Sequence, residues 1–265
     1  VRWWSDWSYV SNDANEIIVD LETFILKRGW FKDNWRAKSR TVDLSPGLKA
    51  IIDEGKKTRI RFEEALTSSA NFTSKDLKLN NIKRTLTDEQ IQNICASLSI
   101  PSGANFSVPG AGKTTTTLAI WSHLVESEKI NKLLVICPKS AFEAWLKDEP
   151  LDTFNNSPKT QSLDGEVIRS DVSILVTNYE KLENKLNLDK LLDWLSANQV
   201  MLVIDEAHRI KGGGNSVRWR ACKKLSQRAK RVELLTGTPM PQSYNDLKNL
   251  LQLSWNGLPA SYLTE

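Results

Sequence analysis

The sequence predicts an α/β domain, a parallel β-sheet sandwiched by helices, with a small and mostly helical accessory region before it. From residue 84 onward, short continuous apolar runs alternate with helical patterns, which is typical of a parallel sheet covered on both faces. A glycine-rich turn at 107–114 lies between a short apolar run and a helical pattern. A later apolar run, 200–204, leads directly into two carboxylates, Asp205 and Glu206. Together these observations indicate a sheet whose carboxyl edge carries a ligand site.

Residues 1–80 are expected to form the accessory region, whose role the sequence leaves open, and residues 81–265 the α/β domain. Apolar residues at helical spacing predict a helix over 16–27. Trp3, Trp4 and Trp7 open the chain; such rings stack on nucleic-acid bases or, more commonly, anchor a small domain against its neighbour. The polar stretch 68–80 is expected to be a linker.

The elements of the α/β domain follow from local signals. A helix is expected to begin within 86–90, where Thr87 or Asp88 serves as the N-cap. Ser140 and Glu143 have the spacing of a capping box at the start of another helix. Continuous apolar runs predict buried strands, and periodic segments between them predict helices. The expected strands are 104–108, 133–137, 172–177, 200–204 and 231–235, and the other expected helices are 114–123, 179–197 and 243–253.

Composition places the chain among ordinary globular sequences and disfavours several classes. Hydrophobic residues make up 40% and charged residues 26%, and the net charge of +4 permits a polyanionic partner without requiring one. The three cysteines are widely separated, so we expect small buried or free thiols of a reducing compartment. With two histidines, a histidine zinc site or a Ser-His-Asp hydrolase is disfavoured. No apolar stretch approaches the roughly 20 residues that span a bilayer, so no membrane partner is expected.

The glycine-rich turn has the composition of a phosphate-binding loop. Gly110 and Gly112 permit backbone conformations in which successive N–H groups point at phosphate oxygens. Lys113 would reach the terminal phosphates, Thr114 would hold Mg²⁺, and the N-terminus of the following helix favours negative charge. Ser107 stands where the first glycine of the G-x-x-x-x-G-K-[ST] pattern is usual. The nucleotide-binding residues expected in this loop are Pro109, Gly110, Ala111, Gly112, Lys113, Thr114 and Thr115.

The carboxylates that follow 200–204 supply the second half of the predicted site. Asp205 is expected to take Mg²⁺ through its water shell, and Glu206 to orient or deprotonate the attacking water. Phosphoryl transfer depends mostly on positioning and charge neutralisation, so Lys113, Asp205 and Glu206 are the expected catalytic residues. A carboxylate pair at a strand end is also a common helix cap, but the preceding phosphate loop favours the catalytic interpretation.

Three segments together resemble motifs I, II and III of the superfamily 2 helicases and translocases: AGKT at 111–114, DEAH at 205–208 and TGTP at 236–239. The wording CPKS at 137–140, with Trp145 beyond it, resembles motif Ia, and VTNY at 176–179 resembles motif Ib. Motifs Ia and Ib, together with RIK at 209–211 directly after motif II, are similar to those of the Swi/Snf-type branch of that superfamily. Gln90, or alternatively Gln92, stands where the adenine-reading glutamine of motif Q lies in that family. The resemblance covers about residues 84–259 and implies a RecA-like lobe.

The resemblance also implies roles for residues outside the phosphate loop. It implies that four residues couple the nucleotide state to the nucleic-acid surface: His208, Thr236, Gly237 and Thr238. A purely structural role for the histidine is the alternative. Contacts with a nucleic-acid backbone are implied for residues that follow strand ends on the opposite side of the lobe, and for one residue of the motif II extension: Lys139, Ser140, Asn178, Tyr179 and Lys211. The segment 209–231 contains nine Lys or Arg and no acid, which suits tracking along a duplex, although a solvated helix face also explains it.

By this resemblance, the chain is the first motor lobe of an ATP-dependent double-stranded DNA translocase, with ATP and Mg²⁺ as cofactors. Hydrolysis in that family also needs arginines of a second RecA-like lobe, for which no chain remains after Glu265, so this chain alone is expected to be nearly inactive. A strand-separating DNA or RNA helicase lobe and a nucleotide-gated protein-interaction module are the alternatives. An intracellular location is expected, cytoplasmic in a bacterium or nuclear in a eukaryote. A protein partner would bind through the N-terminal region.

Overall fold

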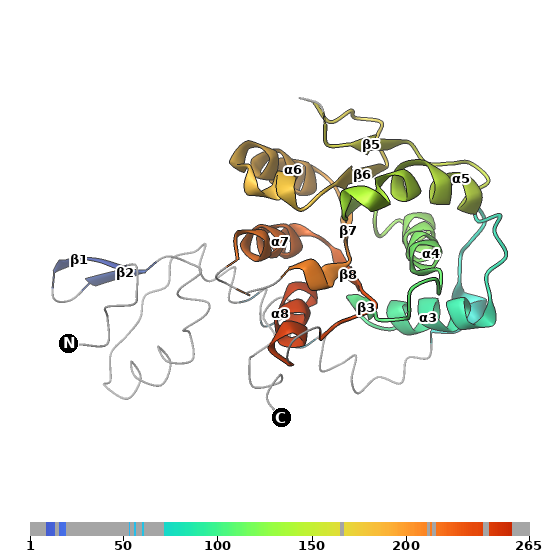
Figure 1. The fold of residues 1–265 in the computed structure, drawn as a ribbon, viewed down its shortest axis with the longest axis horizontal. Helices are drawn as coiled ribbons and strands as arrows, with labels where there is room; N and C mark the ends of the chain where they lie inside the picture. The colour runs from blue at the N-terminus through green and yellow to red at the C-terminus, as the bar shows by residue number, and fades with distance from the viewer. Residues whose placement is uncertain are drawn as a thin grey trace. The chain divides into compact units, whose positions relative to one another are not determined.

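The computed structural model describes residues 9–13, 16–19, 53, 56, 60, 72–164, 167–210, 213, 216–240 and 244–255. The chain divides into two units, Val1–Gly55 and Lys56–Glu265, which are described separately (Figure 1). The division of the sequence into an accessory region, 1–80, and an α/β domain, 81–265, stays a prediction. Among the described residues, no helix combines the length and the apolar character needed to cross a membrane.

The first unit contains a short antiparallel pair of strands. Strand β1, Tyr9–Asp13, pairs with β2, Glu16–Val19, so that Tyr9 faces Val19. The prediction of a helix over 16–27 is therefore wrong for residues 16–19. Ile17, Ile18 and Val19 are β-branched and favour extended backbone over helix. The remaining part of the expected helix lies outside the described residues.

The second unit is built on a parallel sheet, as predicted. Within the described residues this sheet has six strands in the order β3-β8-β7-β4-β6-β5, and every adjacent pair is parallel. Continuous apolar runs form its central strands because both faces of a parallel sheet are covered. The strands are β3 (Gly103–Asn105), β4 (Lys132–Ile136), β5 (Thr160–Ser162), β6 (Ile174–Thr177), β7 (Val200–Asp205) and β8 (Arg231–Leu235).

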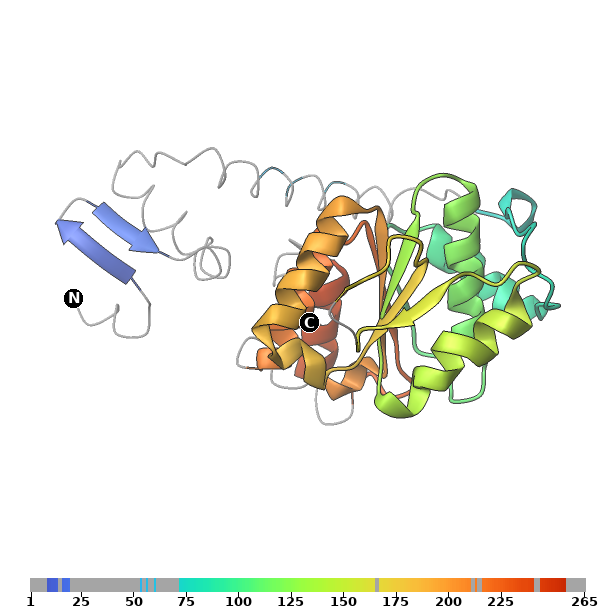
Figure 2. The same ribbon diagram turned by 90° about the horizontal axis from the view of Figure 1, so that it is seen from above.

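Helices cover the sheet in two layers (Figures 1 and 2). Alternate residues of the central strands belong to two separate cores: in β4, Leu133 and Val135 belong to one, and Leu134 and Ile136 to the other. One layer contains α3 (Asp88–Leu98), α4 (Lys113–Glu126) and α5 (Glu149–Thr153), and the other contains α6 (Lys185–Ala197), α7 (Val217–Arg228) and α8 (Tyr244–Ser254). The short helical turns are η1 (Ser74–Asp76), η2 (Lys139–Ala141), η3 (Ala144–Asp148), η4 (Glu180–Glu183) and η5 (Ala207–Arg209).

Several local predictions are confirmed and others are corrected. Thr87 is the N-cap of α3, and the three cysteines, all within the described ranges, are free thiols. The strand expected over 104–108 ends at Asn105, whose Oδ1 accepts a hydrogen bond from the Ser107 backbone N–H and turns the chain into the loop. The capping box expected at Ser140 does not start a regular helix; the described chain there forms η2 and then the π-helical η3. Strand β5 was not predicted because its sequence, Thr-Gln-Ser, is polar.

Candidate functional site

The predicted phosphate loop and the predicted carboxylates meet at one edge of the sheet. Asn105, the last residue of β3, is in register with Leu235 of β8, which is in register with Asp205 of β7. Because these strands are parallel, the segments that follow all three emerge at the same edge. Ile136 of β4 is level with Ile204 of β7 and with Thr177 of β6. The expectation that the residues after β4 and β6 lie on the opposite side of the lobe is therefore wrong, since they share this edge.

The loop between β3 and α4 has the backbone that a phosphate cradle needs. Gly110 and Gly112 have φ angles of 85° and 74°, in the left-handed region that glycine adopts freely. Helix α4 begins at Lys113, so its first N–H groups face the loop. The Lys113 ammonium donates hydrogen bonds to the carbonyl oxygens of Ser107, at 2.9 Å, and Val108, at 3.1 Å. These neutral acceptors hold the lysine over the loop without neutralising its charge.

Gln90 lies against the phosphate loop. It belongs to the capping box of α3: its backbone N–H donates to Thr87 Oγ1, and its Oε1 accepts from the Thr87 N–H, at 3.2 Å and 3.0 Å. Its Nε2 is so close to Gly112 that a Cβ atom on that glycine would overlap it. Gln92 is exposed. Of the two glutamines considered, Gln90 is therefore the one beside the loop, and its role in reading adenine stays a prediction.

The Asp205 carboxylate is held from two directions. Its Oδ2 accepts from the indole N–H of Trp145 at 2.9 Å, and its Oδ1 accepts from the Glu206 backbone N–H at 2.9 Å. Burial raises the pKa of this carboxyl above its ordinary value; the two hydrogen bonds and the positive charge of Lys113 oppose the rise. Trp145, from the π-helical turn η3, is completely buried. Sequence reasoning assigned no role at the site to this tryptophan.

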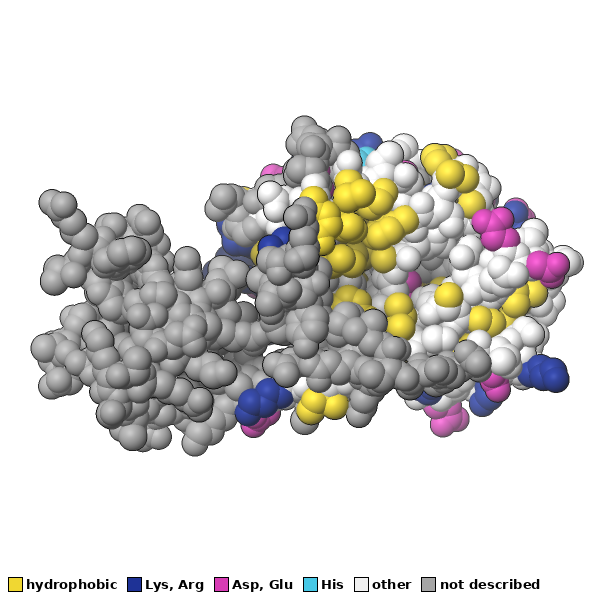
Figure 3. Space-filling view, turned by 90° about the horizontal axis from the view of Figure 1, so that it is seen from below, with side chains coloured by type: hydrophobic (Ala, Val, Ile, Leu, Met, Phe, Trp, Pro, Cys, Tyr) yellow, Lys and Arg dark blue, Asp and Glu magenta, His cyan; other side chains and the backbone are white. Residues whose placement is uncertain are grey.

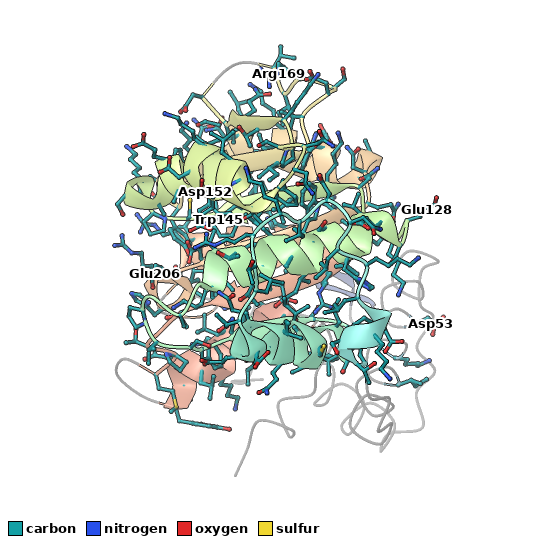
Figure 4. All side chains as sticks on the ribbon, turned by 90° about the vertical axis from the view of Figure 1, so that its right-hand side faces the viewer. Asp53, Glu128, Trp145, Asp152, Arg169 and Glu206 are labelled. Carbon is teal, nitrogen blue, oxygen red and sulfur yellow. The ribbon has the colours of Figure 1, made fainter. Side chains whose placement is uncertain are left out.

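Glu206 begins a series of polar contacts that crosses to the segment after β8. Its backbone is left-handed, with φ of 51°, which is uncommon for a non-glycine residue and typical of functional sites. His208 Nδ1 lies 3.2 Å from Glu206 Oε2 and shares a hydrogen bond of 2.9 Å with Thr236 Oγ1. The same Oγ1 accepts a hydrogen bond from the Thr238 N–H at 3.1 Å. Figure 4 shows Glu206 on the side of the lobe where α4 begins, whereas Glu128, which follows α4, lies at its other end.

The segment after β8 also touches the phosphate loop directly. The Thr236 N–H donates to the Asn105 carbonyl at 3.2 Å. A Cβ atom on Gly237 would lie 3.1 Å from Cδ of Pro109, so only a small residue fits there without displacing the loop. The structure thus brings together the four residues of the predicted coupling group, His208, Thr236, Gly237 and Thr238, with the loop and with Glu206. Their coupling role stays a prediction.

Thr115 connects the start of α4 to the start of α5. Its buried hydroxyl donates to Glu149 Oε2 at 2.9 Å, and the same oxygen is paired with Arg84 Nη1 at 3.1 Å. The Thr115 side chain is therefore occupied inside the fold, and the neighbouring Thr114 is the one left to face a ligand. Neither Arg84 nor Glu149 was predicted, since a lone charge in a sequence does not reveal its partner.

The residues predicted to contact a nucleic acid differ in accessibility. Lys139 and Ser140 are exposed. Asn178 and Tyr179 are each 1% exposed: the Asn178 Oδ1 accepts from the Lys181 N–H, and the Tyr179 hydroxyl donates to the Asp205 carbonyl. Burial also raises the pKa of this hydroxyl well above its ordinary value. These two side chains act inside the fold here, and their contact with a nucleic acid stays a prediction that requires rearrangement. Lys211 lies outside the described residues.

The residues present fit a magnesium nucleotide better than a protein-held metal. No group of three or more His, Cys, Asp or Glu capable of holding a metal occurs among the described residues. Mg²⁺ bound with a nucleotide needs fewer protein ligands, because phosphates and water supply most of its oxygens. Thr114, in the first turn of α4, and Asp205, at the end of β7, would supply two such oxygen donors, and their role as metal ligands stays a prediction. The fold and this arrangement define a P-loop nucleotide-binding lobe of the RecA type.

Comparison with known proteins gives the family. The family model described as the SNF2-related domain matches residues 106–258, more than half of the chain. The Sulfolobus solfataricus SWI2/SNF2 ATPase core domain superposes with a TM-score of 0.58 at 27% identity, over 72% of this chain and 38% of that one. The same core solved in complex with dsDNA gives 0.57 at 26% identity, over 69% and 38%. The chain belongs to the SNF2-related family, and its fold is that of an ATPase motor lobe of the helicase and translocase kind.

Curated relatives match over a similar segment. The chromatin structure-remodeling complex subunit snf21 of Schizosaccharomyces pombe is 28% identical over 151 residues, which cover 54% of this chain and 12% of the relative. The DNA excision repair protein ERCC-6-like of Bos taurus is 26% identical over 164 residues, which cover 56% and 12%. The match thus spans about an eighth of each relative's length.

Proposed function

We propose that this chain is the first motor lobe of an ATP-dependent double-stranded DNA translocase, and that it binds ATP with Mg²⁺. The observation that supports this most is the convergence of Lys113 and Asp205 at one sheet edge within an SNF2-related fold. Similarity to an ATPase core solved with dsDNA supports duplex DNA as the partner.

Each residue at the edge has a distinct task in this proposal. Magnesium ATP supplies the phosphoanhydride bond and a divalent charge beside it when it is bound. The Lys113 ammonium neutralises charge on the terminal phosphates, and the loop N–H groups orient them. Thr114 and Asp205 hold the metal and its water shell. The Glu206 carboxylate orients the attacking water and takes its proton, while His208 stays within 3.2 Å of Glu206.

Efficient hydrolysis needs a second lobe in this proposal. An arginine supplied across a cleft contributes about 10³–10⁵ in rate in related phosphoryl-transfer systems. Apolar side chains around the loops suit a covering partner: Val108 is 70% exposed, and Met240 and Tyr244 are about half exposed. Figure 3 shows that hydrophobic side chains also gather on the face of the lobe that is seen from below. We therefore expect this chain alone to bind ATP weakly and hydrolyse it very slowly.

The test compares variants of two lysines on the same helix layer. Lys113→Ala is expected to abolish nucleotide binding, measured by displacement of a fluorescent ATP analogue in the presence of Mg²⁺. Lys129→Ala removes the same charge from an exposed position in the turn after the far end of α4, and it is expected to leave nucleotide binding unchanged. Glu206→Gln is expected to retain binding and to block hydrolysis once a second lobe is supplied. Equal binding by the two lysine variants, or full turnover by Glu206→Gln, would contradict the proposal.

Nucleic-acid binding distinguishes the proposed function from its alternatives. Filter binding of duplex DNA at two salt concentrations should show affinity that falls steeply with salt, because phosphate contacts release counterions. Duplex-stimulated hydrolysis without strand separation in the two-lobe enzyme favours a translocase, whereas strand separation identifies a helicase. Absence of salt-sensitive DNA binding identifies a nucleotide-gated protein-interaction module.

A further inference from the structure

Helix α3 is held at both of its ends by parts of the nucleotide site. At its N-terminal end, Gln90 lies against Gly112 of the phosphate loop. At its C-terminal end, Ser97 meets two side chains of β8, the strand that leads into Thr236. The position of Gln90 along the helix axis therefore depends on contacts made about two turns away.

The contact at the C-terminal end is a buried guanidinium. Arg231 is 6% exposed and its Nη2 donates to both the carbonyl and the hydroxyl of Ser97, each at 2.7 Å. Its Nη1 donates to the Ile100 carbonyl at 2.7 Å and to the Pro101 carbonyl at 3.3 Å. Ser97 belongs to the last turn of α3, where unpaired acceptors and the helix dipole favour a cation, and Ile100 and Pro101 belong to the segment that follows the helix. One planar side chain thus joins the last turn of α3 and the segment after it to β8.

Glu233 completes the arrangement from the same strand. It is 1% exposed, and its Oε1 accepts from Arg231 Nε at 2.8 Å and from the Ser97 hydroxyl at 2.8 Å. A buried ion pair contributes little net stability, because desolvation offsets its Coulomb energy, but it fixes geometry when its hydrogen bonds are satisfied. Here the geometry that it fixes is the distance between α3 and β8.

Ile94 of α3 is fully buried in the apolar core, but the packing of α3 is incomplete beside Ser97. A hollow of about 180 Å³ lies between α3, β3 and α4, lined by Asn93, Ser97 and Thr116 among others. The Thr116 hydroxyl is buried without a hydrogen-bond partner in the described part of the chain. A helix beside a hollow is less constrained by its neighbours than one in a close-packed core. The polar contacts of Arg231 and Glu233 with Ser97, which we call the tie, therefore contribute more to the position of α3.

We propose that Arg231 is a positioning residue for recognition of the nucleotide base: by holding the end of α3 to β8, it sets where Gln90 stands over the phosphate loop. The inference rests on the proposed binding of ATP and adds a determinant of base selectivity. Lys113 and the loop backbone bind the phosphates, and they make none of the contacts of Arg231. Loss of the tie therefore weakens discrimination between bases and leaves binding of the phosphates intact.

Two substitutions disrupt the tie in different ways. Arg231→Lys keeps the charge beside Glu233 but cannot span the three carbonyls with one ammonium. Ser97→Ala keeps both charges and removes the hydroxyl that joins them to α3, so it serves if the first variant folds poorly. Arg218→Lys is the control, because Arg218 also pairs with a glutamate, 2.7 Å from its Nε to Glu183 Oε1, but it lies in the helix layer on the other side of the sheet.

The experiment measures dissociation constants of the full chain for ATP, GTP and tripolyphosphate, which lacks a base. Both tie variants are expected to reduce the preference for ATP over GTP about tenfold, the size of one to two hydrogen bonds, with tripolyphosphate affinity unchanged. Amide hydrogen exchange within α3 should rise in both, and Arg218→Lys should match the native chain. Gln90→Ala should cause the same loss of preference, and adding Arg231→Lys to it should cause no further loss.

Three outcomes would overturn the inference. They are an unchanged preference for ATP in both tie variants, an equal weakening of all three ligands, and full additivity with Gln90→Ala. Binding of neither ATP nor tripolyphosphate by the native chain would overturn the proposed function as well. Retained ATP binding with unchanged preference would overturn only the role of Arg231.

Discussion

Replacing Trp145 by phenylalanine tests how Asp205 is held. The substitution keeps an aromatic ring in the buried position and removes the N–H that donates to Asp205 Oδ2 at 2.9 Å. A hydrogen bond to a charged group contributes about 1.5–3 kcal/mol, and a buried carboxylate that loses one keeps its desolvation cost. We therefore expect Trp145→Phe to lower the free energy of unfolding by about 2 kcal/mol beyond the effect of lost ring area.

Trp121 supplies the matched control for that experiment. It is also buried in this lobe, yet its indole N–H has no hydrogen-bond partner among the described residues. Urea denaturation of Trp145→Phe and Trp121→Phe at neutral pH should differ by the hydrogen-bond contribution, or roughly 1 M in the midpoint. In an Asp205→Asn background the extra cost should fall to about half, because a neutral acceptor makes the weaker bond. Equal midpoints for the two phenylalanine variants, or an undiminished cost beside Asn, would refute this reasoning.

Two further predictions concern the phosphate loop and the pH dependence of stability. Gly112→Ala should displace Gln90 and weaken ATP binding at least tenfold more than Gly110→Ala, as measured by equilibrium binding. Both positions require left-handed backbone, but a Cβ atom at Gly110 meets no described atom within 4 Å, whereas one at Gly112 would overlap Gln90. Burial lowers the pKa of His123, whose Nδ1 accepts from the Lys78 N–H, so the unfolded chain takes up this proton first. Stability should therefore be complete above pH of about 6.5 and fall as pH drops below it, and denaturation of His123→Gln should lack this part of the pH dependence.

The sequence is most informative where one signal constrains both local structure and position. The apolar run 200–204 with two carboxylates at its end predicts a central strand, its direction and a ligand site, and β7 with Asp205 and Glu206 has that form. The glycines of the phosphate loop are equally direct, because only glycine adopts positive φ freely. Such signals extend over neighbouring residues, so they can be read before any long-range contact is known.

The contacts that the sequence did not reveal join residues far apart in the chain. Trp145 and Asp205 are separated by 60 positions, and Ser97 and Arg231 by 134. A tryptophan in an apolar segment and an arginine at the start of a strand are ordinary features of a sequence. Their partners depend on the order of the strands in the sheet, in which β8 lies between β3 and β7. The burial of Tyr179 is unpredicted for the same reason: the resemblance implies a nucleic-acid contact for it, whereas its hydroxyl here bonds to the neighbouring strand end inside the fold.

Strand β8 contacts both halves of the site, the phosphate loop and the carboxylates at the end of β7, and so fixes their relative position. Arg231, the first residue of β8, holds the end of α3. Thr236, the residue after β8, is hydrogen-bonded to Asn105 of β3 and to His208, which follows β7. A rigid strand with contacts at both ends transmits displacement between them, since a packed interior does not deform continuously. A shift of the phosphate loop would thus reach His208 through Thr236, and a shift of α3 would reach the same residue through β8. This shared connection is the physical reason to expect that nucleotide binding and the segment after motif II respond together.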